Sequence, residues 1–166
     1  MVITNFSNDL GVRQALASTA VLQQAVDSCC CGKQQSPPAA ALSITQTSAV
    51  VVVTPPGSTL ELTGVQVSVK ATNSGSQMAA DVVITVNLSP TLESPPYGLS
   101  ASGWASSSFS QLVSPAFSLA QGDSQNFVLT LIGGVDAPAV TVTSSASATA
   151  AGGVSVSSNP LHFTVG

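Results

Sequence analysis

The chain has 166 residues, of which 44% are hydrophobic and only 6% are charged, whereas about a quarter of the residues in an ordinary soluble domain carry charge. Its cations, Arg13, Lys33 and Lys70, are scattered, which excludes the clustered basic surface that nucleic acids and anionic membranes require. We therefore expect a folded protein with a hydroxyl-rich surface and little charge repulsion to keep its copies apart.

Residues 1–28 are predicted to form an N-terminal arm with a helix over residues 8–28. Asn8 supplies an N-cap, and apolar residues then recur at three- and four-residue spacing. Ahead of the helix, residues 2–6 alternate like a short strand. A lone helix of this length is marginal in water, so the arm packs either on its own domain or on a neighbouring copy. The arm residues expected to make that contact are Val2, Phe6, Leu16 and Leu22.

The start of the chain does not resemble a secretion signal, because residues 1–6 carry no cation and the apolar stretch after them is weak. No apolar run reaches the length of a transmembrane helix. We expect a protein that reaches the outside without such a signal, and with no membrane span.

Residues 29–41 are predicted to be a hinge that contains three adjacent cysteines, Cys29, Cys30 and Cys31. Pro37 and Pro38 make the rest of the hinge a short extended spacer. Neighbouring cysteines do not easily bond to each other, and the remainder of the chain contains no cysteine. The cluster therefore favours disulfides to another copy, with reduced thiols or a shared metal ion as the alternatives.

Residues 42–166 are predicted to form a series of consecutive β-strands separated by Gly and Pro residues. The expected strands are residues 41–53, 60–69, 82–88, 117–119, 127–131, 140–143, 154–156 and 161–165. A one-residue slip of the apolar alternation at Thr63 and Gly64 predicts a β-bulge there. Seven or eight short strands of this kind predict an all-β, antiparallel β-sandwich.

Four motifs follow one another within this region. They are Val-Ser-Val-Lys-Ala-Thr-Asn-Ser-Gly at 67–75, a strand ending in Leu-Ser-Pro at 80–90, Ser-Gly-Trp at 102–104, and Phe-Ser-Leu-Ala-Gln-Gly-Asp-Ser before a strand at 117–131. In this order they resemble the bacterial and archaeal surface-protein repeat called domain of unknown function eleven. The resemblance implies an immunoglobulin-like sandwich at a cell surface and no catalytic residue. The chain differs from that family in its single copy, its few acids and its arm.

The layout of the first 41 residues is similar to that of bacterial endospore appendage subunits. Those subunits also place a connector with adjacent cysteines and a short spacer before a β-sandwich, although the domain sequences are unlike. The similarity implies that Cys29, Cys30 and Cys31 bond covalently to a neighbouring subunit.

The remaining reactive residues do not form a catalytic set. His162 lies between two inward-facing residues and is expected to face solvent, and a lone histidine cannot complete a Ser-His-Asp triad. Trp104 is expected in the core. Asp123 and Asp136 are expected as turn residues, with calcium binding across a loop end as the alternative. We therefore expect no enzyme activity, no cofactor and no resident metal.

The sequence as a whole indicates a structural subunit of a self-assembling extracellular filament, appendage or surface layer on a cell or spore. Copies of itself are the expected partners, and a surface anchor protein of unknown identity is the other partner considered. The alternative is a decoration or binding module on a cell surface or virion. Polymer formation that depends on concentration distinguishes the two.

Overall fold

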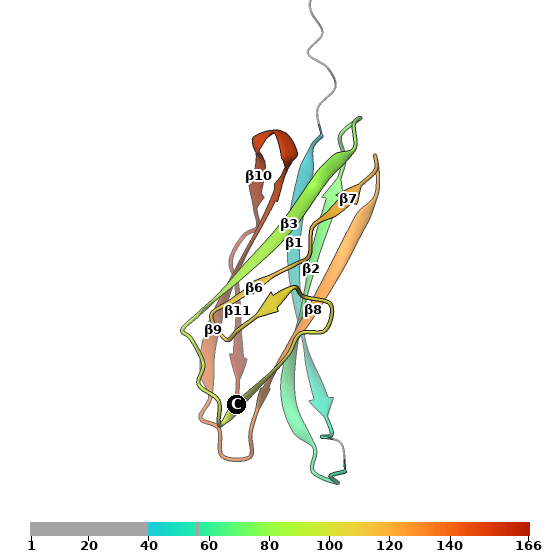
Figure 1. The fold of residues 1–166 in the computed structure, drawn as a ribbon. Helices are drawn as coiled ribbons and strands as arrows, with labels where there is room; N and C mark the ends of the chain where they lie inside the picture. Colours follow the sequence, from blue (N-terminus) through green and yellow to red (C-terminus); the bar gives the residue numbers. More distant parts are fainter. Residues whose placement is uncertain (1–39, 56) are drawn as a thin grey trace, which may run out of the picture. The chain divides into compact units, whose positions relative to one another are not determined.

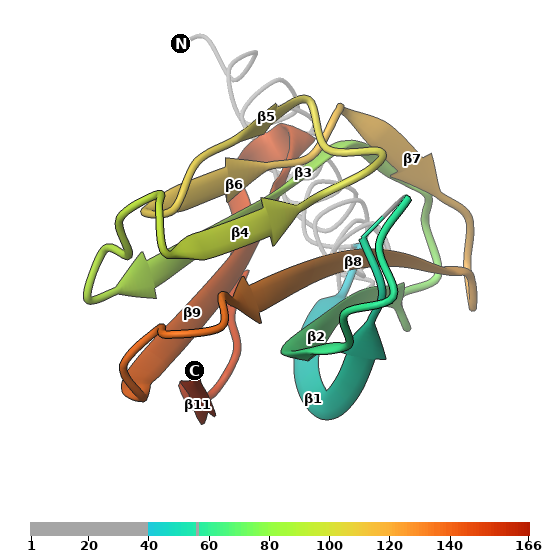
Figure 2. The ribbon, with the colours of Figure 1, turned by 90° about the horizontal axis from the view of Figure 1, so that it is seen from below.

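The computed structural model describes residues 40–55 and 57–166, and these residues form two antiparallel sheets in a sandwich-like arrangement (Figures 1 and 2). In spatial order the first sheet comprises β1 (Leu42–Val53), β2 (Leu62–Asn73), β8 (Ser124–Gly133) and β4 (Tyr97–Ser100). The second comprises β10 (Val154–Ser157), β9 (Val140–Ala150), β3 (Ala79–Ser89), β6 (Gln111–Val113) and β5 (Ser106–Ser107). In addition, β11 (Leu161–Val165) pairs with β9, and β7 (Phe117–Leu119) pairs with β3. The prediction of an all-β antiparallel sandwich is confirmed at this level.

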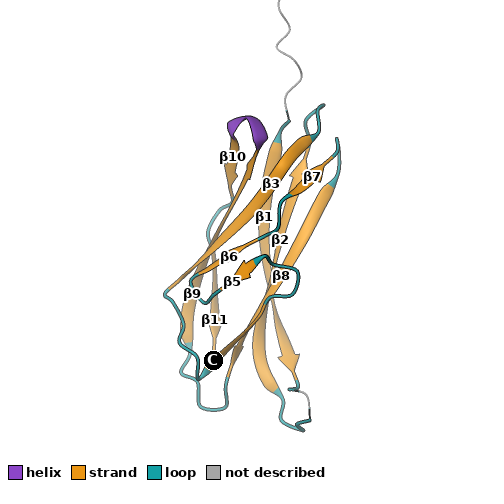
Figure 3. Cartoon of the chain, viewed as in Figure 1, coloured by secondary structure: helices purple, strands orange, loops and turns teal. Residues whose placement is uncertain are grey.

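Helix is nearly absent from the part of the chain that the structure describes. A single 3₁₀ turn, η1 (Ala151–Gly153), joins β9 to β10 (Figure 3). The predicted arm helix over residues 8–28 and the predicted hinge up to residue 39 lie outside the described residues.

The core lies between the two sheets and follows the expected two-residue alternation. The buried apolar residues at alternating positions are Val82, Ile84, Val86 and Leu88 on β3, and Phe127, Leu129 and Leu131 on β8. On β2 they are Val65, Val67, Val69 and Ala71. Because each large apolar side chain contributes about 1.5–3 kcal/mol when it is fully buried, these three strands supply much of the stability of the fold.

The predicted bulge at Thr63 and Gly64 is wrong. From Leu62 to Asn73, β2 pairs with β1 without a break, and from Gly64 onward it also pairs regularly with β8. The alternation slips in the sequence because Leu62 lies on the outer face of the sheet, opposite Val53, and not because a residue is inserted. The irregularity lies instead in β3, between Ala79 and Val82, where Asp81 adopts a φ of 52°.

Three of the eleven strands were not predicted. β4, β5 and β6 contain four, two and three residues and lie in a stretch, residues 97–113, whose many Ser and Gly residues leave no long alternation of apolar and polar residues. β4 and β6 still contribute to the core, because Tyr97 and Leu112 are buried, whereas both residues of β5 are exposed.

Candidate assembly surface

Strand β1 is an edge of the first sheet. It pairs with β2 along its whole length, and no described strand pairs with its other side. On that side, alternate backbone N–H and C=O groups therefore face away from the sheet. The strand has twelve residues, Leu-Ser-Ile-Thr-Gln-Thr-Ser-Ala-Val-Val-Val-Val, with no charge, no proline and no break in register.

The first half of β1 is covered by the second sheet. Ile44 is buried, and the Gln46 side chain reaches across to that sheet. Gln46 Nε2 donates to the Ser144 carbonyl at 3.2 Å and to Ser158 Oγ at 2.7 Å, while Ser144 Oγ donates to Gln46 Oε1 at 2.5 Å. These bonds join the first half of β1 to β9, through Ser144, and to the segment between β10 and β11, through Ser158.

The second half of β1 extends beyond this cover. Val50 pairs with Val65, and directly opposed residues project from the same face of a sheet. Val65 is 4% exposed, yet Val50 is 74% exposed and Val52 is 65% exposed. Both valines therefore point toward the inner side of the sandwich at a place where no described residue covers them.

The outer face of the same region is also apolar. Val51 and Val53 are half-buried there, opposite Gly64 and Leu62 respectively. Ile132 of β8 follows in the same row as Gly64. We call Val50, Val51, Val52 and Val53 the valine edge. It is apolar on both faces and lies at the end of β1 that turns into β2, opposite the end where β1 begins (Figure 1).

Sequence reasoning identified this strand but not its exposure. The run of four valines predicts a strand equally well whether it is buried or at an edge. Only the pairing of β1 shows that the second sheet ends before the valines do.

A hollow of about 240 Å³ lies beside the valine edge. Leu60, Leu62 and Val135 contribute apolar side chains to it, and Leu60 and Val135 are 45% and 71% exposed. Glu61 is its only charged lining residue. Its other polar side chain is the hydroxyl of Thr63, and no histidine is among the described residues that line it.

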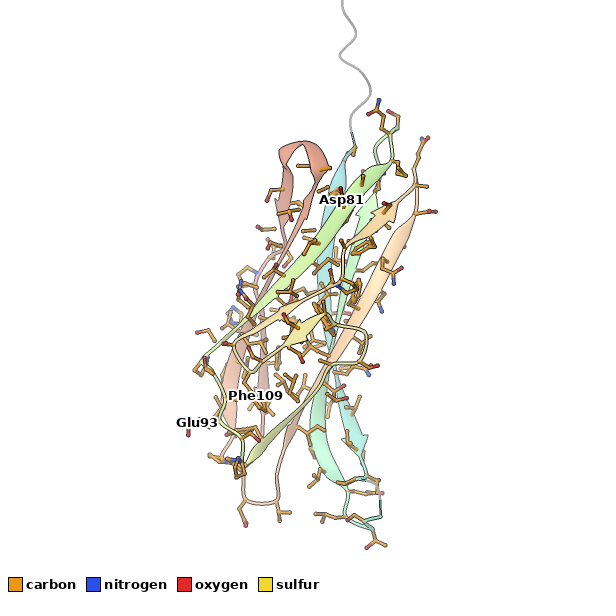
Figure 4. All side chains as sticks on the ribbon, viewed as in Figure 1. Asp81, Glu93 and Phe109 are labelled. Atoms are coloured by element: carbon orange, nitrogen blue, oxygen red, sulfur yellow. The ribbon has the colours of Figure 1, made fainter. Side chains whose placement is uncertain are left out.

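The acidic residues of the described chain are dispersed. Figure 4 shows Asp81 on β3 far from Glu93, which lies between β3 and β4. Within the described ranges, no three His, Cys, Asp or Glu side chains come close enough together to hold a metal ion.

The calcium site considered for Asp123 and Asp136 is wrong. The two aspartates flank opposite ends of β8, a ten-residue strand that spans about 33 Å. Calcium ligands must all lie within about 2.6 Å of the ion, so the two cannot share one. Asp123 is instead a turn residue, as expected, and its backbone N–H donates to the Ala120 carbonyl at 3.1 Å.

His162 and Trp104 occupy the kinds of position that the sequence predicts. His162 is exposed on β11, with its Nδ1 2.9 Å from Thr143 Oγ1. Trp104 packs against the core at its margin and is half-buried. Its ring centroid lies 5.3 Å from that of Phe127, and its Nε1 donates to the Val128 carbonyl at 2.9 Å.

Asn73 joins several segments of the fold, and sequence reasoning missed this role. Its side chain is fully buried, and its Nδ2 donates to the carbonyls of Gln77 and Leu119 at 2.7 and 3.0 Å. Its Oδ1 accepts from the backbone N–H of Ala41 at 3.2 Å and of Gly75 at 3.0 Å. Asn73 thereby joins the beginning of β1 to two turns.

The residues predicted to make contacts between copies lie outside the described residues. These are the disulfide candidates Cys29, Cys30 and Cys31, and the arm residues Val2, Phe6, Leu16 and Leu22. Among the described residues, no helix is long and apolar enough to cross a membrane.

A scan against protein-family models found no match, and neither did a search of curated proteins. Among solved structures, the chain is similar to BslA, a bacterial hydrophobin, at 12% identity and a TM-score of 0.44, over 75% of this chain and 94% of that one. It is similar to a FixG-related protein from Vibrio parahaemolyticus at 12% identity and a TM-score of 0.33, over 72% and 95%.

A third similar structure is AvmM, which catalyses macrocyclization in alchivemycin A biosynthesis. It is 11% identical, with a TM-score of 0.36 over 72% of this chain and 87% of that one. These neighbours differ in function and their backbones match only loosely, so they do not indicate what this chain does.

Proposed function

We propose that the chain is a structural subunit that assembles with copies of itself into a filament, appendage or surface layer outside a cell or spore. The observation that carries the proposal is the valine edge, an uncharged strand end that no described residue covers, on a protein with only 6% charged residues. Proteins that remain monomeric usually protect an edge strand with charge, proline, a bulge or a short length. β1 has none of these protections along its twelve residues.

We also propose an immunoglobulin-like topology for the sandwich. The order β1-β2-β8-β4 corresponds to the A-B-E-D sheet of that fold, and β11-β9-β3 corresponds to its G-F-C sheet. β4 departs from the pattern, because it precedes β5, β6 and β7 in the chain instead of directly preceding β8.

The arm and the cysteines complete the proposal as connectors between copies. Every strand of the described sandwich lies between Leu42 and Val165, and in this proposal residues 1–39 make the contacts to other copies. A disulfide between two copies must join cysteines of this same tripeptide, because Cys29, Cys30 and Cys31 are the three cysteines of the sequence.

Negative-stain electron microscopy of the purified full-length chain tests this function. We expect regular filaments or sheets whose abundance increases with protein concentration. Single particles of monomer size at every concentration would contradict the proposal and favour a decoration or binding module.

A further inference from the structure

Among the residues that the structure describes, nothing covers the valine edge on its inner face or pairs with its free side. Its inner face exposes Val50 and Val52, its outer face carries Val51 and Val53, and its free side presents unpaired backbone groups among the described strands. Another β-strand placed along this side would satisfy the backbone groups and cover apolar atoms at the same time. The question is which strand fits.

The absence of charge on β1 indicates which kind of strand can pair with it. No residue from Leu42 to Val53 is charged, so a charged strand would lose solvation there without gaining an opposite charge. A strand that is equally uncharged and apolar meets no such penalty. β1 of a second copy has these properties and carries no like charge that would oppose the pairing.

Antiparallel pairing of β1 with itself also matches residue for residue. If the pairing is centred on Val51, Val50 lies opposite Val52 and Ala49 lies opposite Val53, so apolar residues meet apolar residues on both faces. A twofold axis perpendicular to the sheet keeps the two inner faces on the same side. Val50 and Val52 of both copies would then form one apolar cluster at a place where neither second sheet intrudes.

We propose that two copies pair through their β1 edges, antiparallel and centred near Val51, and thereby join two four-stranded sheets into one continuous sheet. This inference rests on the proposed function and names one contact of the assembly. An isologous twofold contact closes on itself and gives only pairs. Growth of a polymer from such pairs requires a second contact, which the arm with Cys29, Cys30 and Cys31 supplies.

Substitution of Val50 by lysine tests the pairing without disturbing the fold, because this side chain is 74% exposed. We expect Val50→Lys to raise the dissociation constant of the pair by about tenfold or more, since pairing brings a charge from each copy close to the axis. Met78→Lys is the matched control. Met78 is 62% exposed but lies between β2 and β3, at the end of the sheet where β1 begins, and we expect no change.

A photo-crosslinking residue at position 51 identifies the occupant of the edge by mass spectrometry of full-length protein. A crosslink to residues 49–53 of another copy supports the proposal. A crosslink to residues 2–6 assigns the edge to the arm and overturns it, and so does undiminished association of Val50→Lys. If the protein still forms polymers while Val50→Lys associates normally and position 51 does not crosslink to β1 of another copy, only the β1 pairing is overturned. If the wild-type protein never associates, the proposed function is overturned as well.

Discussion

At the residue scale, Asn73 shows how a single amide can hold together the end of the domain where the chain enters β1. Its side-chain oxygen and nitrogen are both used, and the buried side chains of the described residues leave no polar atom without a partner. Asn73→Asp keeps the shape but replaces the donating amide with a carboxylate that faces carbonyl oxygens. We expect a loss of about 3 kcal/mol or more in the free energy of unfolding, measured by chemical denaturation. Stability close to that of the wild type would mean that the amide bonds contribute little.

Gly134 is a second position where the backbone leaves no room for a side chain. A Cβ atom there would lie 2.7 Å from the carbonyl oxygen of Pro96, which also accepts the Gly134 N–H at 2.9 Å. We expect Gly134→Ala to lower the midpoint of thermal unfolding, at a cost of about 1–3 kcal/mol. Gly98→Ala is the control, because its Cβ would meet Ile132 at an ordinary 3.7 Å. Equal effects of the two substitutions would argue against the close approach.

At the element scale, sequence patterns predicted eight of the described strands, the three-residue β7 among them, and failed on β4, β5 and β6. β3 and β8 show clear alternation, and the expected inward residues are buried in both. β4, β5 and β6 take their conformation from strands to which they are adjacent only in the folded chain: β4 pairs with β8, and β6 pairs with β3. Pairing of this kind depends on distant contacts, so a local pattern cannot reveal it.

The candidate assembly surface was likewise predicted only where it depends on a local pattern. The sequence identified β1 as a strand, but its exposure depends on how far the second sheet extends across the first, which no local property encodes. The role of Asn73 was missed for a similar reason, since its partners come from as far away as Leu119. Asn-Ser-Gly describes a turn in the sequence and does not disclose a buried side chain.

At the scale of the whole molecule, the cysteines are expected to stabilise the assembly and not the sandwich. The sandwich has no cysteine and is held by burial, so its fold does not depend on disulfides. Boiling in detergent without reductant should leave ladders on a gel, and reductant should reduce them to monomer. Replacement of Cys29, Cys30 and Cys31 by serine should preserve assembly while lowering its resistance to denaturant. Free thiols throughout native material, or a bound metal in whole-number ratio, would contradict the crosslink.

The arm is expected to be dispensable for folding and required for growth of the polymer. Removal of residues 1–39 leaves all described strands and keeps Ala41, whose backbone N–H donates to Asn73. We expect the shortened chain to unfold cooperatively, with the circular dichroism of a β-protein, and to stop at small oligomers. Val2→Asp and Phe6→Asp in the full chain should weaken assembly in the same direction. If the shortened chain forms the same polymer, the arm is not the connector.

The central claim, that this chain associates with itself, is tested most directly by sedimentation velocity over a concentration series. The full-length protein is measured with and without reductant, beside Val50→Lys. The account predicts that the weight-average sedimentation coefficient rises with concentration in both conditions, and rises less for the variant. A single monomer-sized boundary at every concentration, unchanged by reductant, would contradict it.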